Sequence, residues 1–226
     1  MKRLLLVIIL FALAYCQECY AADIDKALFG WTARNGSHMQ GVLANEGVSK
    51  KNPLGKQNLA SDPGNFHNGK NCGGTVAGIC CRDNPKFPFK TATIQDVTDY
   101  YHRNQWAAIH GDEIISQYLA FKIFRLAINM GTGTAIILVE KTINDLNGEA
   151  KDYPLHGVLT SDMVQWLNEF TAPQTLVDGT ESNWRRWCFF AQLKLNALDR
   201  YGDLIAGNPK LRVFWENWSG QTEYDK

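Results

Sequence analysis

The sequence lacks both an excess of one charge and an apolar run long enough to cross a membrane. Its 226 residues include 23 basic and 23 acidic side chains, so the formal net charge at pH 7 is zero. Without a strong positive field we do not expect nucleic acid as a partner. The apolar run at residues 4–14 is well short of the ~20 residues that a spanning helix needs, so no stable membrane anchor is expected.

That short apolar run has the features of an export signal. Lys2 and Arg3 precede it, and the small residues Ala21 and Ala22 follow it. A basic start, an apolar centre and a small-residue cleavage site form a secretory signal peptide. We therefore expect a signal peptide at residues 1–21, cleavage after Ala21, and a periplasmic or secreted protein. A retained N-terminal anchor is the alternative.

Four cysteines follow the predicted signal peptide: Cys72, Cys80, Cys81 and Cys188. In an oxidising compartment an even number favours disulfides, and adjacent cysteines are poorly placed to bond each other. Two pairings stay open, Cys72–Cys80 with Cys81–Cys188 or Cys72–Cys81 with Cys80–Cys188, and either ties the irregular region to a late helix. A zinc site of His67 and the three clustered cysteines is the alternative. Exported thiols tend to oxidise before they bind metal, so neither a metal nor another cofactor is expected.

Hydrophobic periodicity predicts a mainly helical chain with one irregular region. Residues 24–46 have a helical apolar period that Gly47 ends. Residues 47–92 are rich in Gly, Asn, Pro and Lys without a sustained period, and short strands are expected around residues 75–79. Further helices are predicted at residues 93–106, with Thr93 as N-cap, and at residues 113–130, 135–146, 161–170 and 181–200. The expected fold class is mainly α (α+β), with a small irregular or β-containing lobe at residues 47–92.

One acidic residue stands at the end of the first predicted helix. Glu46 precedes Gly47, and a glycine-rich stretch at residues 72–79 follows with Thr75 inside it. Glycosidic-bond cleavage needs a carboxylic acid held over a cleft, where an apolar wall can raise its pKa so that it keeps a proton near neutral pH. Glu46 is therefore the candidate general acid.

These residues also carry a resemblance to a known family. The segments Glu46-Gly47, Asp62-Pro63-Gly64, Gly73-Gly74-Thr75 and Gly78-Ile79 resemble the signature Glu-Gly-Gly-Tyr … Asp-Pro-Gly-Gly-x-Thr-x-Tyr-Gly-Ile of glycoside hydrolase family 108. This family comprises bacterial and phage N-acetylmuramidases with a lysozyme-like fold. Similar stretches continue toward the C-terminus at residues 100–106, 127–131, 143–144, 156–158 and 214–218.

The chain departs from the family signature at several positions. Val48 and Ser49 replace its second glycine and its tyrosine, and Ala77 replaces a later tyrosine. The Asp-Pro-Gly-Gly run is split by residues 65–72. Either Asp62 keeps the aspartate role while the insert bulges out, or Asn71 takes that place and the carboxylate is lost.

The resemblance implies a peptidoglycan muramidase that hydrolyses the β-1,4 bond between N-acetylmuramic acid and N-acetylglucosamine. Glu46 would be the general acid, Asp62 would stabilise the developing cation or orient water, and Thr75 would position the water or hold a carboxylate through its hydroxyl. The implied domains are a lysozyme-like catalytic domain at residues 22–140 and a helical peptidoglycan-binding segment at residues 141–220. Retention or inversion of configuration stays open.

Candidate substrate-binding residues are Tyr101, Trp106 and Asn129, because sugars stack on aromatic faces and hydrogen-bond to amides. The expected partners of a monomeric protein are glycan strands of peptidoglycan and, in a bacteriolytic role, an inhibitor or immunity protein. Two other functions stay open: a non-catalytic peptidoglycan-binding or secretion-accessory protein that kept the fold, and a lytic transglycosylase that uses a single Glu.

Overall fold

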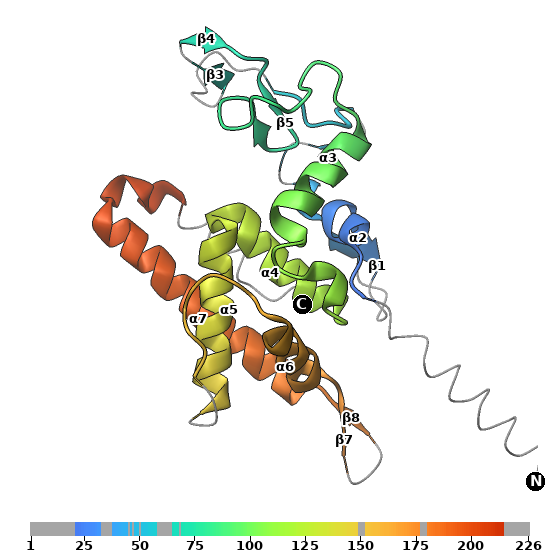
Figure 1. Ribbon diagram of the computed structural model, residues 1–226, viewed down its shortest axis with the longest axis vertical. Coiled ribbons are helices and arrows are strands. Elements are labelled where there is room, and N and C mark those ends of the chain that lie inside the picture. The colour runs from blue at the N-terminus through green and yellow to red at the C-terminus, as the bar shows by residue number, and fades with distance from the viewer. Residues whose placement is uncertain are drawn as a thin grey trace, which may run out of the picture.

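The computed structural model describes residues 21–32, 38–44, 46, 48–49, 51–57, 65–67, 69–148, 152–176 and 180–214. Over these residues the chain forms a helical body with a lobe of short antiparallel strands at one end (Figure 1). The mainly helical α+β fold expected from the sequence is confirmed. Residues 1–20 of the predicted signal peptide lie outside the described residues.

The helices of the body follow the predicted ones, with ends shifted by a few residues. Thr93 opens the first of them with a capping box: the Thr93 hydroxyl accepts from the backbone N–H of Asp96, and the Asp96 carboxylate accepts from the backbone N–H of Thr93. The elements are α3 (Ile94–Tyr101) with the π-helical turn η4 (His102–Trp106), η5 (Gly111–Glu113), α4 (Gln117–Met130), α5 (Thr132–Asn147), α6 (Ser161–Thr171), the hairpin β7 (Gln174–Thr175) and β8 (Glu181–Ser182), α7 (Trp184–Gly207) and η6 (Pro209–Phe214). None of the described helices is long and apolar enough to cross a membrane.

The start of the chain differs from prediction, because the single helix expected at residues 24–46 is wrong. Instead α2 (Ile24–Phe29) leads into the antiparallel strands β1 (Gly30–Thr32) and β2 (His38–Gln40) and the 3-10 turn η2 (Val42–Ala44). A Cβ on Gly30, whose φ is +97°, would lie 2.4 Å from the carbonyl oxygen of Met39. A Cβ on Gly41 would lie 2.2 Å from the carbonyl oxygen of Leu28. Two glycines therefore let the chain fold back tightly against the end of α2.

The lobe contains two separate hairpins, β3 (Phe66–His67) with β4 (Lys70–Asn71) and β5 (Thr75–Val76) with β6 (Ile79–Cys80). The strands expected around residues 75–79 are thus confirmed. Val76 and Ile79 are buried and attach the second hairpin to the core. A bridge between Gln57 and Thr75 joins the preceding segment to β5.

A disulfide joins Cys72 to Cys81, whose Cα atoms are 5.7 Å apart, and encloses the second hairpin. Cys80 is a free thiol that donates to Asp83 Oδ2 at 3.0 Å, and Cys188 is free and exposed on α7. Cys81 is buried in the lobe, whereas the side chain of its neighbour Cys80 points toward Asp83. Only Cys81 is therefore placed to bond Cys72. The pairings Cys72–Cys80, Cys81–Cys188 and Cys80–Cys188 are therefore wrong, and among the described residues no disulfide ties the lobe to α7.

Helix α5 is shared between the two halves of the body, because it packs against both α4 and α7. Asn196 of α7 donates to the hydroxyl of Thr142 on α5 at 3.0 Å. The fully buried Glu140 of α5 accepts from the backbone N–H of Gly157 at 2.9 Å, which holds the loop before α6. The expected domain division at residue 140 falls inside this helix. The assignment of a catalytic and a binding part stays a prediction.

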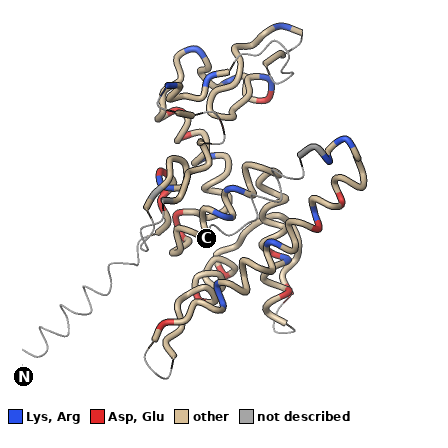
Figure 2. Tube along the Cα trace, turned by 180° about the vertical axis from the view of Figure 1, so that it is seen from behind, with Lys and Arg blue, Asp and Glu red and all other residues tan. Residues whose placement is uncertain are grey.

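Charged side chains of both signs are interspersed along the described trace rather than gathered on one side (Figure 2). The equal numbers of acidic and basic residues are thus also mixed in space over the described residues.

Candidate functional site

Glu46 is held in a tight turn directly after η2. Its backbone N–H donates to the carbonyl oxygen of Leu43 at 3.0 Å, and the N–H of Val48 donates to the same oxygen at 3.2 Å. The Glu46 side chain is half-buried, and burial raises the pKa of its carboxyl above the ordinary value. Among the described residues no cation and no hydrogen-bond donor pairs with this carboxyl. No described protein group therefore favours its charged form.

The turn of the second hairpin lies against this carboxyl. Ala77 and Gly78 link β5 to β6 and both have positive φ, 48° and 79°, as a two-residue hairpin turn of type I′ requires. A Cβ built on Gly78 would lie 2.6 Å from Glu46 Oε2. Glycine thus serves twice here, because it permits the turn and leaves room for the carboxyl beside the backbone.

Tyr101 of α3 completes the arrangement from the other side. Its hydroxyl donates to the carbonyl oxygen of Ala77 at 2.6 Å and lies 3.0 Å from the point that a Gly78 Cβ would occupy. Burial, and then the nearby Glu46 charge, raise the pKa of the Tyr101 hydroxyl far above its ordinary value. A turn, a hairpin and a helix that are distant in sequence therefore meet at Glu46.

The other predicted catalytic residues do not join Glu46 among the described residues. Asp62 lies outside the described residues. The Thr75 hydroxyl donates to Oδ1 of Asn65 at 3.0 Å, and the Asn65 side chain is fully buried. This hydrogen bond therefore joins β5 to the segment before β3. Asn71, the alternative to Asp62, is exposed on β4, and its Oδ1 accepts from the backbone N–H of Gly73 at 3.0 Å.

The predicted substrate-stacking residues are core residues instead. Trp106 is fully buried and donates its indole N–H to Asp112 Oδ1 at 2.8 Å, so a sugar cannot reach its face. The Tyr101 ring is also buried and offers no open face for stacking, although its hydroxyl lies close to Glu46. Asn129 donates to the hydroxyl of Tyr201 at 2.9 Å and thereby links α4 to α7.

The proposed zinc alternative does not survive, because Cys72 and Cys81 are joined to each other. No group of three or more His, Cys, Asp or Glu side chains suited to a metal ion occurs among the described residues.

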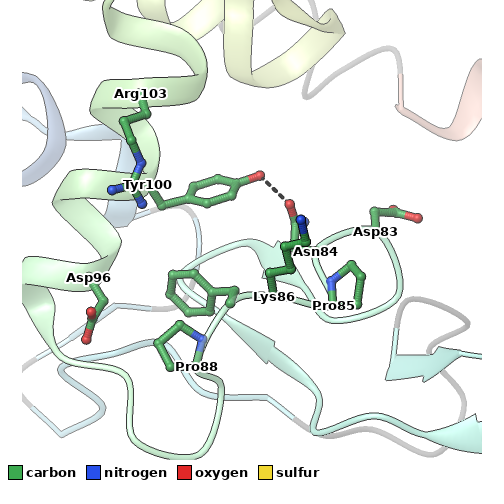
Figure 3. A pocket seen from close by; sticks show the side chains of 9 residues that line it. Asp83, Asn84, Pro85, Lys86, Pro88, Asp96, Tyr100 and Arg103 are labelled. Carbon is green, nitrogen blue, oxygen red and sulfur yellow. Dashed lines mark hydrogen bonds between the residues drawn. The ribbon is translucent and has the colours of Figure 1, made fainter.

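A pocket of about 350 Å³ opens beyond Tyr101, between the loop that follows β6 and helix α3 (Figure 3). Glu46 does not line it, but Tyr100 does, and its ring packs edge-on against Tyr101 at a centroid distance of 5.5 Å. The edge-to-face contacts continue in both directions, to Phe87 in the pocket and through Phe124 to Trp106 in the core. The sequence prediction missed this pocket. Its signal in the sequence is the pair of adjacent tyrosines, Tyr100 and Tyr101. Neighbouring side chains of a helix point about 100° apart, so one ring can lie in the core while the other lines a surface pocket.

Comparison with known proteins adds information on the fold. The chain matches no family model and no curated protein. It is similar to the solved structure of Brucella abortus SagA, with a TM-score of 0.51 and 18% sequence identity over 80% of this chain and 84% of that chain. At this identity the likeness shows a shared fold alone.

Proposed function

We propose that the protein is a peptidoglycan-degrading N-acetylmuramidase in which Glu46 is the general acid. The half-buried Glu46 carboxyl against the Gly78 backbone carries this proposal. A general acid must still hold its proton when it meets the glycosidic oxygen, and burial without a cationic partner favours the protonated form. The acid then protonates the leaving oxygen as the C–O bond breaks and positive charge develops on the sugar.

The substrate class comes from the resemblance to glycoside hydrolase family 108. The residues around Glu46 that carry it include Gly78, whose backbone contacts the carboxyl. In this proposal the second catalytic group is Asp62, which stabilises the cation or orients water. The protein acts on glycan strands in the periplasm or outside the cell, in wall remodelling, secretion or bacteriolysis.

Clearing of purified cell walls by the wild type and by Glu46→Gln tests the proposal. Removal of a general acid typically costs ~10²–10⁴-fold in rate, and we expect a loss of this size. Glu169→Gln is the matched control, because Glu169 is an exposed carboxyl on α6 and glutamine can still accept the hydrogen bond of Gln165. This control should clear walls like the wild type.

Each outcome of this assay identifies a different function. No clearing by the wild type, or equal clearing by Glu46→Gln, refutes the muramidase. Wall binding without clearing indicates the non-catalytic accessory protein. Mass spectrometry of released muropeptides separates hydrolysis, which leaves reducing ends, from lytic transglycosylation, which leaves anhydro ends.

A further inference from the structure

The pocket beside Tyr101 is built by a rigid loop. Asn84 and Pro85 open a β-turn in which the N–H of Phe87 donates to the carbonyl oxygen of Asn84 at 3.0 Å. The Asn84 side chain is used at both ends: its amide donates to the carbonyl oxygen of Cys80 at 3.0 Å, and its oxygen accepts from the Tyr100 hydroxyl at 2.8 Å. With the disulfide at Cys81 and a second proline at position 88, the loop is held in shape before any ligand arrives.

Two half-buried aromatic rings form the apolar wall of the pocket. The rings of Phe87 and Tyr100 meet edge-on at a centroid distance of 5.7 Å, and each remains partly open to solvent. Pro85 and Pro88 extend this wall (Figure 3). The volume of about 350 Å³ lies at the small end of the ~300–1,000 Å³ of ligand sites, so the pocket suits one ring-sized group.

The charges around the pocket favour an anionic group on that ring. The two acids are already engaged: Asp83 pairs with Arg82 at 2.8 Å, and Asp96 accepts from Thr93 at the start of α3. The two cations, Lys86 and Arg103, form no ion pair within 4.0 Å and no hydrogen bond among the described residues. Hydrogen bonds from Thr93, and then the charge of Arg103, lower the pKa of Asp96. With Asp83 paired to Arg82, Lys86 and Arg103 together outweigh the single charge of Asp96, so the pocket keeps an excess of positive charge for a ligand. Lys86 comes from the loop after β6 and Arg103 from the π-helical turn η4 (Figure 3).

We propose that this pocket binds one carboxylate-bearing pyranose ring of the glycan strand, with the ring on Phe87 and Tyr100 and the carboxylate between Lys86 and Arg103. The N-acetylmuramic acid unit of a peptide-free strand has this chemistry. The proposal rests on the proposed function, since it takes the substrate of Glu46 as the source of the ring. In this proposal the pocket is a further subsite for the same strand, and the contact of Tyr100 with Tyr101 connects its wall to the residue whose hydroxyl lies near Glu46.

Calorimetric titration of the Glu46→Gln chain tests the subsite without turnover. Three probes are compared: a peptide-free tetrasaccharide of alternating N-acetylglucosamine and N-acetylmuramic acid, chitotetraose, which has no carboxylate, and the free stem tetrapeptide of peptidoglycan. Hydrogen bonds to charged groups contribute enough that losing both cations should weaken binding about tenfold or more. We expect Lys86→Gln/Arg103→Gln to show this loss for the acidic tetrasaccharide and no change for chitotetraose.

The control Lys70→Gln/Arg200→Gln removes the same charge from exposed positions on β4 and α7 and should bind like the parent. Phe87→Ala should weaken both oligosaccharides, with circular dichroism to check that the fold is intact. Unchanged binding of the acidic tetrasaccharide by the Lys86 and Arg103 double variant overturns the subsite. Equal dependence of the stem tetrapeptide on these cations also overturns it, because the carboxylate then belongs to a peptide.

These results separate the subsite from the proposed function. If walls are not cleared but the acidic tetrasaccharide binds through Lys86 and Arg103, the muramidase fails and the subsite stands. If clearing depends on Glu46 while the double variant binds like the parent, the subsite fails and the muramidase stands.

Discussion

At the scale of single residues, the Glu46 carboxyl makes folding depend on pH. Its pKa is raised in the folded protein, so between the unfolded value of about 4.3 and the folded value the native state binds more protons than the unfolded state. The free energy of unfolding therefore falls as pH rises through this window. Above it, the desolvated charge is a constant cost to stability.

We predict that Glu46→Gln is more stable than the wild type at pH 8 and equally stable below about pH 3, where the wild-type carboxyl is neutral in both states. Melting temperatures of the two proteins at matched pH values measure the difference. Glu169→Gln should give no such pH-dependent difference. A Glu46→Gln protein that melts below the wild type at pH 8 contradicts the raised pKa.

Gly78 allows a test of the contact with Glu46. Gly78→Ala introduces a Cβ 2.6 Å from Glu46 Oε2 and places a side chain at a φ of +79°, so we expect lower activity and a loss of about 1–2 kcal/mol in stability. Gly69→Ala is a close control, because its φ is +72° but nothing lies within 4 Å of the added Cβ. It should lose stability through backbone strain and keep its activity. Equal loss of activity in both variants would mean that the Gly78 contact is not specific to the site.

At the scale of elements, the disulfide decides how firmly the second hairpin is held. Cys72 and Cys81 are nine residues apart, and closure of such a loop stabilises a protein by about 2–3 kcal/mol in the chain-entropy model. We predict this loss for Cys72→Ser/Cys81→Ser in denaturant unfolding. Cys188→Ser, which removes an exposed free thiol, should unfold like the wild type. A double variant as stable as the wild type contradicts a structural role for the bond.

Elements of regular period were predictable from sequence, and those made by close contact were not. Thr93 signals its capping box locally, so the start of α3 is readable from sequence. Leu28 and Leu43 are buried at helical spacing, yet the close approaches at Gly30 and Gly41 break the helix between them. These close approaches involve backbone atoms about ten or more residues apart, and the hydrophobic period of the sequence carries no information about them.

The candidate site shows the same division. The place of Glu46 before a glycine makes it a candidate in the sequence, but its contact with Gly78 joins residues from two elements and is visible only in the fold. Trp106 and Tyr101 were predicted at the surface of a cleft because aromatic residues serve both sugars and cores. The residue type is the same whether an aromatic side chain binds sugar or fills the core, and only its burial in the fold distinguishes the two roles.

At the scale of the whole molecule, α5 makes the two halves of the body depend on each other. It packs against α4 and α7, and Asn196 hydrogen-bonds to Thr142 across the second interface. We predict that a fragment of residues 22–148 aggregates and lacks a cooperative melting transition, because α7 no longer covers the apolar face of α5. Size-exclusion chromatography and circular dichroism compare it with the full chain. A monomeric fragment that melts near the full chain would show that the front half folds alone.

The aromatic contacts from Phe87 through Tyr100, Tyr101 and Phe124 to Trp106 give the molecule an optical readout. Rings held edge-on in a fixed, chiral order produce near-ultraviolet circular dichroism, and a buried indole has a spectrum distinct from that of exposed ones. A ligand that tilts the Tyr100 ring changes its edge-on contacts with Phe87 and Tyr101, and so changes the coupling between the rings of this series. Occupation of the pocket can therefore be followed without a label, in the native chain, as a change in the absorption of polarised light by its own side chains.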